Sequence, residues 1–246
     1  MKMGKVLMEC EDKRRIIVPE GITHIEGYFG DYEQLEELFL PDSLIKIGEG
    51  VFSDCINLKK IHFGDGIEEI GDDAFSGCDS LEEVMLPGSI NWIGQNAFAS
   101  CNSLRYVYVF DGVDAKGDDY IMNIADRAFA CCEKLKTVDI NKRVEDWGDE
   151  VFERSGLEAF VFPPMVERVH ERDPLHTNVY VGERMFRNCQ QLKEVVLPPN
   201  LERIDEHAFR GCKMLNRVVR QDGAWEEIEL EKMMKYNNSR KEKKDD

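Results

Sequence analysis

The sequence predicts an α/β repeat solenoid, because one apolar pattern returns along nearly all of its 246 residues. A phenylalanine recurs every 23 residues and then, after longer gaps, four more times. The neighbouring Ile70 and Cys78 likewise return 23 residues later as Ile93 and Cys101. The recurrent phenylalanines are Phe29, Phe52, Phe75, Phe98, Phe129, Phe152, Phe186 and Phe209. We therefore expect one continuous domain of stacked coils.

Each coil is predicted to contribute one short strand to a parallel sheet. Between Leu81 and Leu86, the residues Leu81, Val84 and Leu86 are expected to point inward, whereas Glu83 and Met85 point outward. The residues that follow the strand in five coils are Pro41, Gly64, Pro87, Pro163 and Pro198. Proline has no N–H to donate to the next ladder, so the strand is expected to end there.

The rest of each coil is predicted to turn back toward the next strand. A second short extended piece, such as 67–70 or 90–93, precedes a glycine that suits a tight or left-handed turn. These glycines are Gly48, Gly71, Gly94, Gly148 and Gly182. The following segment, 72–78 in one coil, is too short for a long helix and favours one helical or 3₁₀ turn. That turn is expected to direct the phenylalanine into the core.

Both ends of the chain are predicted to be atypical, because a coil cannot bury its apolar side without a neighbour. In the segment 224–236, Trp225, Ile228, Met233 and Tyr236 recur at roughly helical spacing, which favours a C-terminal capping helix. We divide the chain into an N-terminal cap at 1–24, a solenoid of about eight coils at 25–223 with insertions near 111–123 and 168–178, the capping helix at 224–236 and a charged tail at 237–246.

Six of the eight cysteines occupy one slot, three residues after the repeat phenylalanine. They are Cys55, Cys78, Cys101, Cys132, Cys189 and Cys212. Tyr32 and Ser155 take the same place in two other coils, as expected for a packing slot. Stacked coils lie about 4.8 Å apart, a distance that does not by itself exclude a disulfide. We interpret the six as reduced core thiols, with disulfide pairing as the alternative.

The charge balance excludes several classes of partner. The net charge is −17, and no basic stripe is present that would neutralise phosphates, so nucleic acid is not expected to bind. No apolar run approaches the roughly 20 residues that span a bilayer. Charged residues interrupt the first ten positions, and no signal peptide is predicted. The protein is therefore expected to be cytoplasmic, or to have lost a leader.

The string from Leu58 to Leu81, LKKIHFGDGIEEIGDDAFSGCDSL, resembles the BspA-like class of leucine-rich repeat, whose coils read LxxIxLPxxLxxIGxxAFxxCxxL. The resemblance extends over eight coils, from about Ile25 to Val218. It implies a right-handed leucine-rich repeat coil with a parallel concave β-sheet. Proteins of this class are mostly bacterial or protist surface proteins implicated in adhesion and co-aggregation. The resemblance therefore implies a binding role rather than an enzyme, and a surface or secreted location.

The outward strand positions form the predicted binding surface on the concave face. One column is mostly apolar and the neighbouring column is polar at both ends, so Tyr106 and Tyr108 are expected to meet near the centre. An apolar and aromatic strip rimmed by charges is typical of a protein interface. The alternative is the ordinary preference of strands for aromatic and β-branched residues. The candidate partner-binding residues are Phe39, His62, Met85, Tyr106, Tyr108, Asp139 and Val161.

The two insertions offer weaker candidate sites. In the first, Asp111, Asp114, Asp118 and Asp119 have the chemistry of calcium ligands, but they lack the order D-x-D-x-D-G, which favours a solvated loop.

The second insertion contains His170, Glu171, Asp173 and His176. Their spacing matches neither HExxH nor a known triad, which favours a polar loop that contacts a partner over a metal or catalytic site.

The leading hypothesis is a non-enzymatic protein-binding or adhesion-type module that uses the concave face. It needs no cofactor and no metal, and its partner is a protein whose identity the sequence does not give. One alternative is an assembly element whose apolar strip packs against another copy of the chain. Another is a metal-dependent site in the 170–176 loop.

Overall fold

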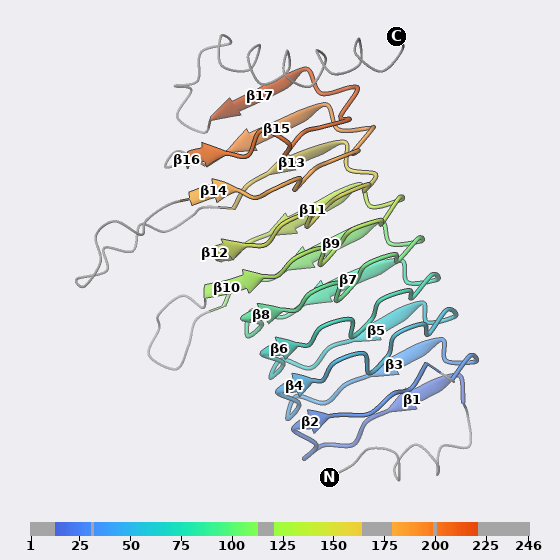
Figure 1. Ribbon diagram of the computed structural model, residues 1–246. Helices are drawn as coiled ribbons and strands as arrows, with labels where there is room; N and C mark the ends of the chain where they lie inside the picture. The colour runs from blue at the N-terminus through green and yellow to red at the C-terminus, as the bar shows by residue number, and fades with distance from the viewer. Residues whose placement is uncertain (1–12, 31, 113–120, 164–178, 199–200, 221–246) are drawn as a thin grey trace, which may run out of the picture.

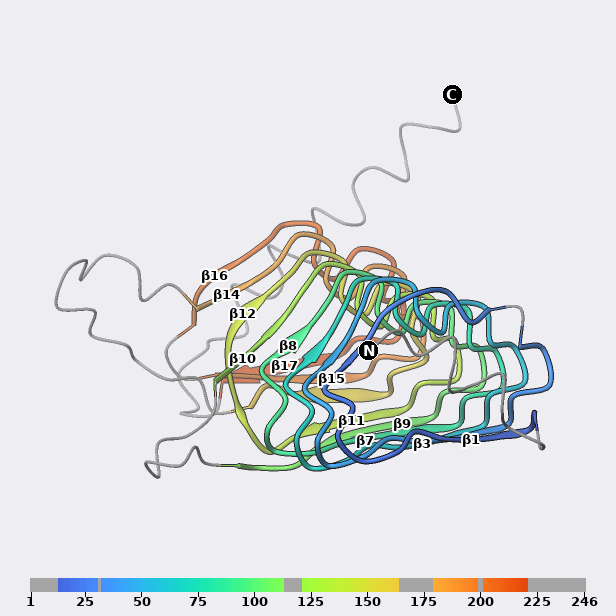
Figure 2. The same cartoon turned by 90° about the horizontal axis from the view of Figure 1, so that it is seen from below.

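The computed structural model describes residues 13–30, 32–112, 121–163, 179–198 and 201–220. These residues form a parallel β-solenoid of about eight turns, one for each recurrent phenylalanine (Figure 1). Each turn carries two strands. Viewed along the stack, the odd-numbered strands follow one side of the coil and the even-numbered strands follow another (Figure 2). The predicted repeat solenoid is confirmed.

The odd-numbered strands are β1 (Arg15–Ile17), β3 (Glu37–Phe39), β5 (Lys60–His62), β7 (Glu83–Leu86), β9 (Tyr106–Val109), β11 (Thr137–Ile140), β13 (Ala159–Val161), β15 (Glu194–Leu197) and β17 (Arg217–Arg220). They form three parallel sheets of three strands, β1-β3-β5, β7-β9-β11 and β13-β15-β17. The side of the coil that was predicted to present one continuous sheet therefore has two interruptions.

The even-numbered strands are β2 (His24–Ile25), β4 (Lys46–Ile47), β6 (Glu69–Ile70), β8 (Trp92–Ile93), β10 (Ile121–Ile124), β12 (Arg143–Trp147), β14 (Val179–Val181) and β16 (Leu201–Ile204). The first six of them form one parallel sheet, and β14 pairs with β16. Both sides of the coil therefore present rows of outward side chains at fixed spacing.

The core is a column of phenylalanine rings, one from each turn. Phe75 stacks on Phe52 and on Phe98 with ring centroids 5.3 Å apart in both pairs, and all three residues are fully buried. Phe98 stacks in turn on Phe129 at 5.5 Å. These rings supply large buried apolar areas, so they dominate the contacts between neighbouring coils.

The cysteine slot lies beside this column, and the cysteines predicted to be reduced core thiols are buried and free of disulfides. The Cys78 thiol donates a hydrogen bond to the carbonyl oxygen of Phe52 at 3.3 Å, and Cys101 donates to Phe75 at the same distance. Burial raises the pKa of Cys55 to about 12, so its thiol stays protonated at neutral pH. The slot therefore contributes packing and a hydrogen bond between coils.

The predicted helical or 3₁₀ turns do not occur, because the described residues form no helix. The segment around Phe75 instead places Asp73 and Gly77 in the left-handed region, with φ of 52° and 72°. A residue with positive φ interrupts a right-handed helix. The same two positions, two residues before and two after the phenylalanine, have positive φ in most coils.

Hydrogen bonds between coils account for this conformation. The N–H groups of Asp73, Phe75 and Gly77 donate to carbonyl oxygens of the next coil at 2.7, 2.8 and 2.9 Å. Each coil therefore supplies hydrogen-bond acceptors for the backbone N–H groups of its neighbour, as buried backbone groups require.

The glycines predicted to make tight or left-handed turns have a different role. Neither Gly71 nor Gly94 has a positive φ. A Cβ atom on Gly71 would lie 2.8 Å from the Gly48 carbonyl carbon, and one on Gly94 would lie 2.6 Å from the Asp72 backbone nitrogen. Glycine is therefore needed here because adjacent coils approach closely.

A buried lysine bridges coils beside the first insertion. Lys142 is 4% exposed, and its ammonium group donates to the carbonyl oxygens of Gly88, at 2.7 Å, and Ile90. These acceptors lie in the coil before the one that contains the insertion. Burial lowers the pKa of Lys142 to about 8. Lys142 thus links its own coil to backbone oxygens two coils earlier.

Several predicted segments fall outside the described residues. They include the first half of the N-terminal cap, the capping helix at 224–236, the charged tail, the inner part of the first insertion and the whole of the second. Within the described ranges, no helix is long and apolar enough to cross a bilayer.

The phenylalanine column gives a prediction about stability. Phe98→Ala removes a fully buried ring and should lower the free energy of unfolding by about 3–5 kcal/mol, measured by urea denaturation. The matched control is Phe110→Ala, because Phe110 is 43% exposed and should cost about 1 kcal/mol or less. Equal losses in the two variants would contradict the proposed role of the column.

Candidate functional site: the face of the odd-numbered strands

The outward residues of the odd-numbered strands form the surface predicted to be concave, called the odd-strand face below. The expected alternation is present in β9, where Val107 and Val109 are fully buried whereas Tyr106 and Tyr108 are partly exposed. It recurs in β7, where Met85 is 36% exposed between the buried Val84 and Leu86. The outward positions therefore present side chains to solvent along most of the stack.

An aromatic cluster lies near the middle of this face, and we call it the tyrosine ridge (Tyr106, Tyr108 and Phe110). The rings of Tyr106 and Tyr108 stack with centroids 6.2 Å apart. Phe110 meets Tyr108 edge to face at 4.5 Å. In the strand register, Met85 and Asp139 flank Tyr108 on its two sides. The ridge is thus a contiguous aromatic surface, with the carboxylates of Asp139 and Glu83 on the neighbouring strands.

Sequence reasoning missed Phe110 as a member of the ridge. It occupies the position where other coils have the proline that ends the strand, so it was not counted as an outward residue. The signal in the sequence was a large aromatic residue at the position where other coils have proline. The predicted pair Tyr106 and Tyr108 does meet as expected.

Desolvation, and then the negative charge of Asp139, raise the pKa of Tyr106. The phenol is therefore neutral at physiological pH, and the ridge offers hydroxyl groups as well as ring surfaces to a partner.

Two other predicted residues, Phe39 and His62, form a separate cluster nearer the N-terminus. Their rings stack at 4.1 Å, and Arg15 lies over the Phe39 ring at 5.0 Å. The His62 Nε2 atom lies 3.1 Å from a Glu37 carboxylate oxygen, and this hydrogen bond lowers the pKa of Glu37. The exposed ring surface here already has charged partners within the chain.

Charged side chains flank the ridge in cross-strand pairs. Toward the N-terminus, Arg15 pairs with Glu37 at 3.0 Å, and Lys60 approaches Glu83 at 3.6 Å. Toward the C-terminus, Arg217 pairs with Glu194 at 2.9 Å. Between these pairs the same strand position holds Tyr106, Thr137 and Ala159. The row of ion pairs is therefore replaced by neutral side chains in the central coils.

Two grooves border the central sheet, one at each interruption. The β5/β7 groove has a volume of about 720 Å³ and is lined by residues that include His62, Met85 and Phe110. The β11/β13 groove has a volume of about 680 Å³ and is lined by residues that include Asp139 and Val161. The tyrosine ridge thus stands on a three-stranded sheet between two hollows.

Both interruptions coincide with a larger side chain at one position of the coil. The last inward position of the strand segment is Leu40, Leu86 or Leu197 in three coils, but Phe63 and Phe162 take this place beside the two grooves. Phe63 meets the core ring of Phe75 edge to face at 6.1 Å, and Phe162 packs against Trp147 at 5.6 Å. We attribute the loss of strand pairing to the extra volume of these rings.

The structure therefore divides the predicted site. Met85, Tyr106, Tyr108 and Asp139 belong to one central sheet. Val161, which is 57% exposed, lies across the β11/β13 groove from Asp139. His62 lines the opposite wall of the β5/β7 groove, and Phe39 lies on the next strand away from it.

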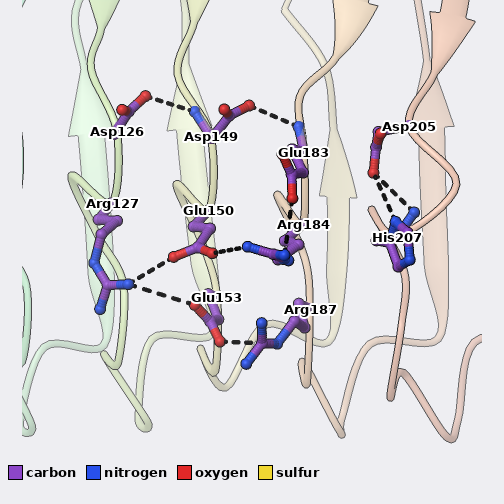
Figure 3. Close-up of polar contacts among 10 residues, drawn as sticks. All are labelled: Asp126, Arg127, Asp149, Glu150, Glu153, Glu183, Arg184, Arg187, Asp205 and His207. Carbon is purple, nitrogen blue, oxygen red and sulfur yellow. Dashed lines mark hydrogen bonds and ion pairs between the residues drawn. The ribbon is translucent and has the colours of Figure 1, made fainter.

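The turn side of the solenoid carries a second concentration of charge, but its members satisfy one another (Figure 3). Arg127 and Arg184 both contact the Glu150 carboxylate, at 2.6 and 3.1 Å. Arg187 contacts Glu153 at 3.1 Å, and Arg127 lies 3.7 Å from the same group. This network links three coils, so we interpret it as structural.

The two carboxylates of this network titrate in opposite directions. Burial pushes the pKa of Glu150 upward, but the hydrogen bonds from Arg184, Glu153 and Arg127 and the charge of Arg127 together outweigh it, so the pKa lies below its ordinary value. Burial and the neighbouring Glu150 raise the pKa of Glu153 above its ordinary value. Glu150 is therefore ionised between Arg127 and Arg184, whereas Arg187 pairs with Glu153.

The remaining candidate sites are weaker. A smaller hollow of about 260 Å³ on the side of the even-numbered strands is lined by residues that include Trp92, Asp72 and Asp126. Within the part of the chain that the structure describes, no three His, Cys, Asp or Glu side chains are placed to hold a metal ion. The predicted loop site at His170 and His176, and three of the four insertion aspartates, lie outside that part.

Comparison with known proteins identifies the repeat. A family model described as the BspA type leucine rich repeat region matches in six copies, over residues 23–119, 114–172 and 175–237. No curated protein matches the chain.

Several solved structures match this chain. A leucine-rich repeat protein of T. pallidum is 21% identical with a TM-score of 0.54, covering 90% of this chain and 84% of that one. A leucine-rich repeat protein from Bacteroides ovatus is 22% identical with a TM-score of 0.32, covering 85% and 69%. A leucine rich cell surface protein from Faecalibacterium prausnitzii is 17% identical with a TM-score of 0.27, covering 85% and 88%. At these identities, the T. pallidum protein supports the fold alone.

The turn-side network predicts opposite pH dependences for two matched variants. The low folded-state pKa of Glu150 stabilises the fold above the ordinary pKa, and this contribution is lost as pH falls through the folded value. Glu150→Gln should therefore cost about 2 kcal/mol at pH 7 and less in acid. The pKa of Glu153 is raised, so its contribution to stability is present at low pH and is lost as the pH rises through the folded value. Glu153→Gln should therefore destabilise the fold less than Glu150→Gln does at neutral pH.

Urea denaturation of both variants between pH 4 and pH 7 measures this difference. The gap in stability between Glu153→Gln and Glu150→Gln should shrink as the pH falls. A gap that does not change with pH would contradict the assigned charge states.

Proposed function

The chain belongs to the BspA-type leucine-rich repeat family, and we propose that it is a protein-binding module whose partner covers the tyrosine ridge and the grooves beside it. Membership of this repeat family suggests a protein-interaction or adhesion-type module. The proposal goes further by assigning the contact surface to Tyr106, Tyr108 and Phe110.

The observation that carries the proposal is the replacement of ion pairs by aromatic rings in the middle of the odd-strand face. On both flanks, charged residues at the same strand position pair across neighbouring coils. In β9, the middle strand of the central sheet, that position and the outward position after it instead expose Tyr106 and Tyr108, with Met85 alongside. Partly exposed aromatic rings inside a polar rim are the composition of interface hot spots.

The shape of the surface supports a protein partner. The grooves of about 720 and 680 Å³ lie on the two sides of the ridge. A partner that straddles the ridge would contact both hollows and bury the rings between them. A protein partner is complementary to a surface with one ridge and two grooves, because different side chains of the partner can fill each groove.

Self-association remains the alternative use of the same surface. In that case the partner is a second copy of the chain, and the molar mass from light scattering should rise with concentration. Constant monomer mass, together with capture of another protein, would favour the leading proposal.

The proposal predicts the effect of charges placed on the ridge. The double variant Tyr106→Glu/Tyr108→Glu should weaken partner binding by more than about 30-fold, because charged side chains would replace two aromatic anchors. Both positions point outward, so circular dichroism should show an unchanged fold. Binding is compared by quantitative affinity capture from cell lysates with the native chain as reference.

The matched control is Trp92→Glu, which places the same charge on an exposed aromatic of the even-numbered strands. Proteins retained by the native chain and by Trp92→Glu, but lost from the tyrosine variant, are the expected result. If all three forms retain the same proteins, the odd-strand face is not the binding surface.

A further inference from the structure

The β11/β13 groove is lined by a carboxylate, Asp139, that has no ion-pair partner among the described residues. Asp139 is exposed on β11 and lines the groove. Among the described residues, no ion pair or side-chain hydrogen bond joins Asp139 to another group. By contrast, Glu158 at the same groove is held by Lys136 at 3.4 Å and by Lys193 at 3.1 Å. Asp139 is therefore available to a group from outside the chain.

The surroundings of Asp139 suit a long basic side chain. Tyr108 is its neighbour across the strand ladder and shares the same face of the sheet. Ala159 and Val161, both exposed, line the opposite wall of the groove. The planar guanidinium group of an arginine binds a carboxylate through two hydrogen bonds and stacks on an aromatic ring. The aliphatic stem of the same side chain covers apolar surface.

We propose that the β11/β13 groove is a subsite for a basic side chain of the partner protein, preferentially arginine. The guanidinium group binds Asp139 beside the Tyr108 ring, while the stem of the side chain lies along Ala159 and Val161. This inference rests on the proposed function, because the groove borders the tyrosine ridge.

The charge pattern also sets the direction of the bound segment. Lys136 and Lys193 lie where β11 and β15 begin, and they share the carboxylate of Glu158. Asp139 lies further along β11, away from this lysine pair. A basic residue is therefore favoured over Asp139 and disfavoured at the lysine end, so a partner segment would bind in one orientation.

The test uses random peptides displayed on phage as the probe. The library is selected on the immobilised native chain and, separately, on Asp139→Lys. Peptides from the native chain should share an arginine or lysine at one position, whereas Asp139→Lys should select an acidic residue there. A selected peptide should bind Asp139→Asn at least about tenfold more weakly than the native chain, measured by fluorescence anisotropy.

A matched control separates the groove from the overall charge. Glu82→Gln removes one exposed carboxylate that does not line the groove, and it should leave the affinity of the peptide unchanged. Selected peptides without a shared basic residue, or with equal affinity for Asp139→Asn and the native chain, would overturn the inference.

The tyrosine double variant distinguishes this inference from the proposed function. If a peptide loses affinity for Tyr106→Glu/Tyr108→Glu but not for Asp139→Asn, the binding surface stands and the arginine subsite fails. If neither variant weakens binding, both fail. A selection that enriches no peptide above uncoated surface counts against both as well.

Discussion

The stacking of coils on one another is the constraint on which the rest of this structure depends. No coil buries its own apolar side, so each relies on its neighbour for side-chain packing and for backbone hydrogen bonds. The Phe75 ring lies between Phe52 and Phe98, and the Phe75 N–H group donates to the Ala97 carbonyl of the next coil. Because every coil repeats these contacts at fixed spacing, outward residues fall into columns. The side chains at adjacent places in a column then determine where a binding surface forms.

The sequence was sufficient to predict the solenoid, the inward residues and the cysteine slot, because apolar periodicity reports burial directly. It was insufficient for the turn side, where helical turns were expected. Arg127 and Glu150 adopt φ of 58° and 57°, although neither residue type favours the left-handed region. The N–H groups of these residues donate hydrogen bonds to the next coil, and the glycines at the two left-handed positions in other coils, Gly50, Gly77 and Gly211, were the local signal for this conformation. Gly71 was predicted to make a tight turn, but glycine is needed there because a Cβ atom would lie too close to the backbone of the preceding coil.

The candidate site was predictable in its centre and not at its edges. Tyr106 and Tyr108 lie together as their spacing requires, since alternate residues of a strand share a face. The two grooves lie instead where Phe63 and Phe162 replace the leucine of three other coils, and strands that a repeat pattern treats as equivalent are unpaired there. Residues that depart from the repeat therefore shape the surface, while residues that follow it form the scaffold.

The most direct test of the binding surface is a hydroxyl-radical footprint of the full chain with and without a peptide selected on it. The exposed Met85 and the ridge tyrosines are readily oxidised side chains, and Trp92 and Met214, which are 39% and 46% exposed, report on other surfaces. The account predicts that the peptide protects Met85, Tyr106 and Tyr108 while Trp92 and Met214 keep their reactivity. Protection of Trp92 or Met214 with unchanged oxidation of the tyrosines would contradict it.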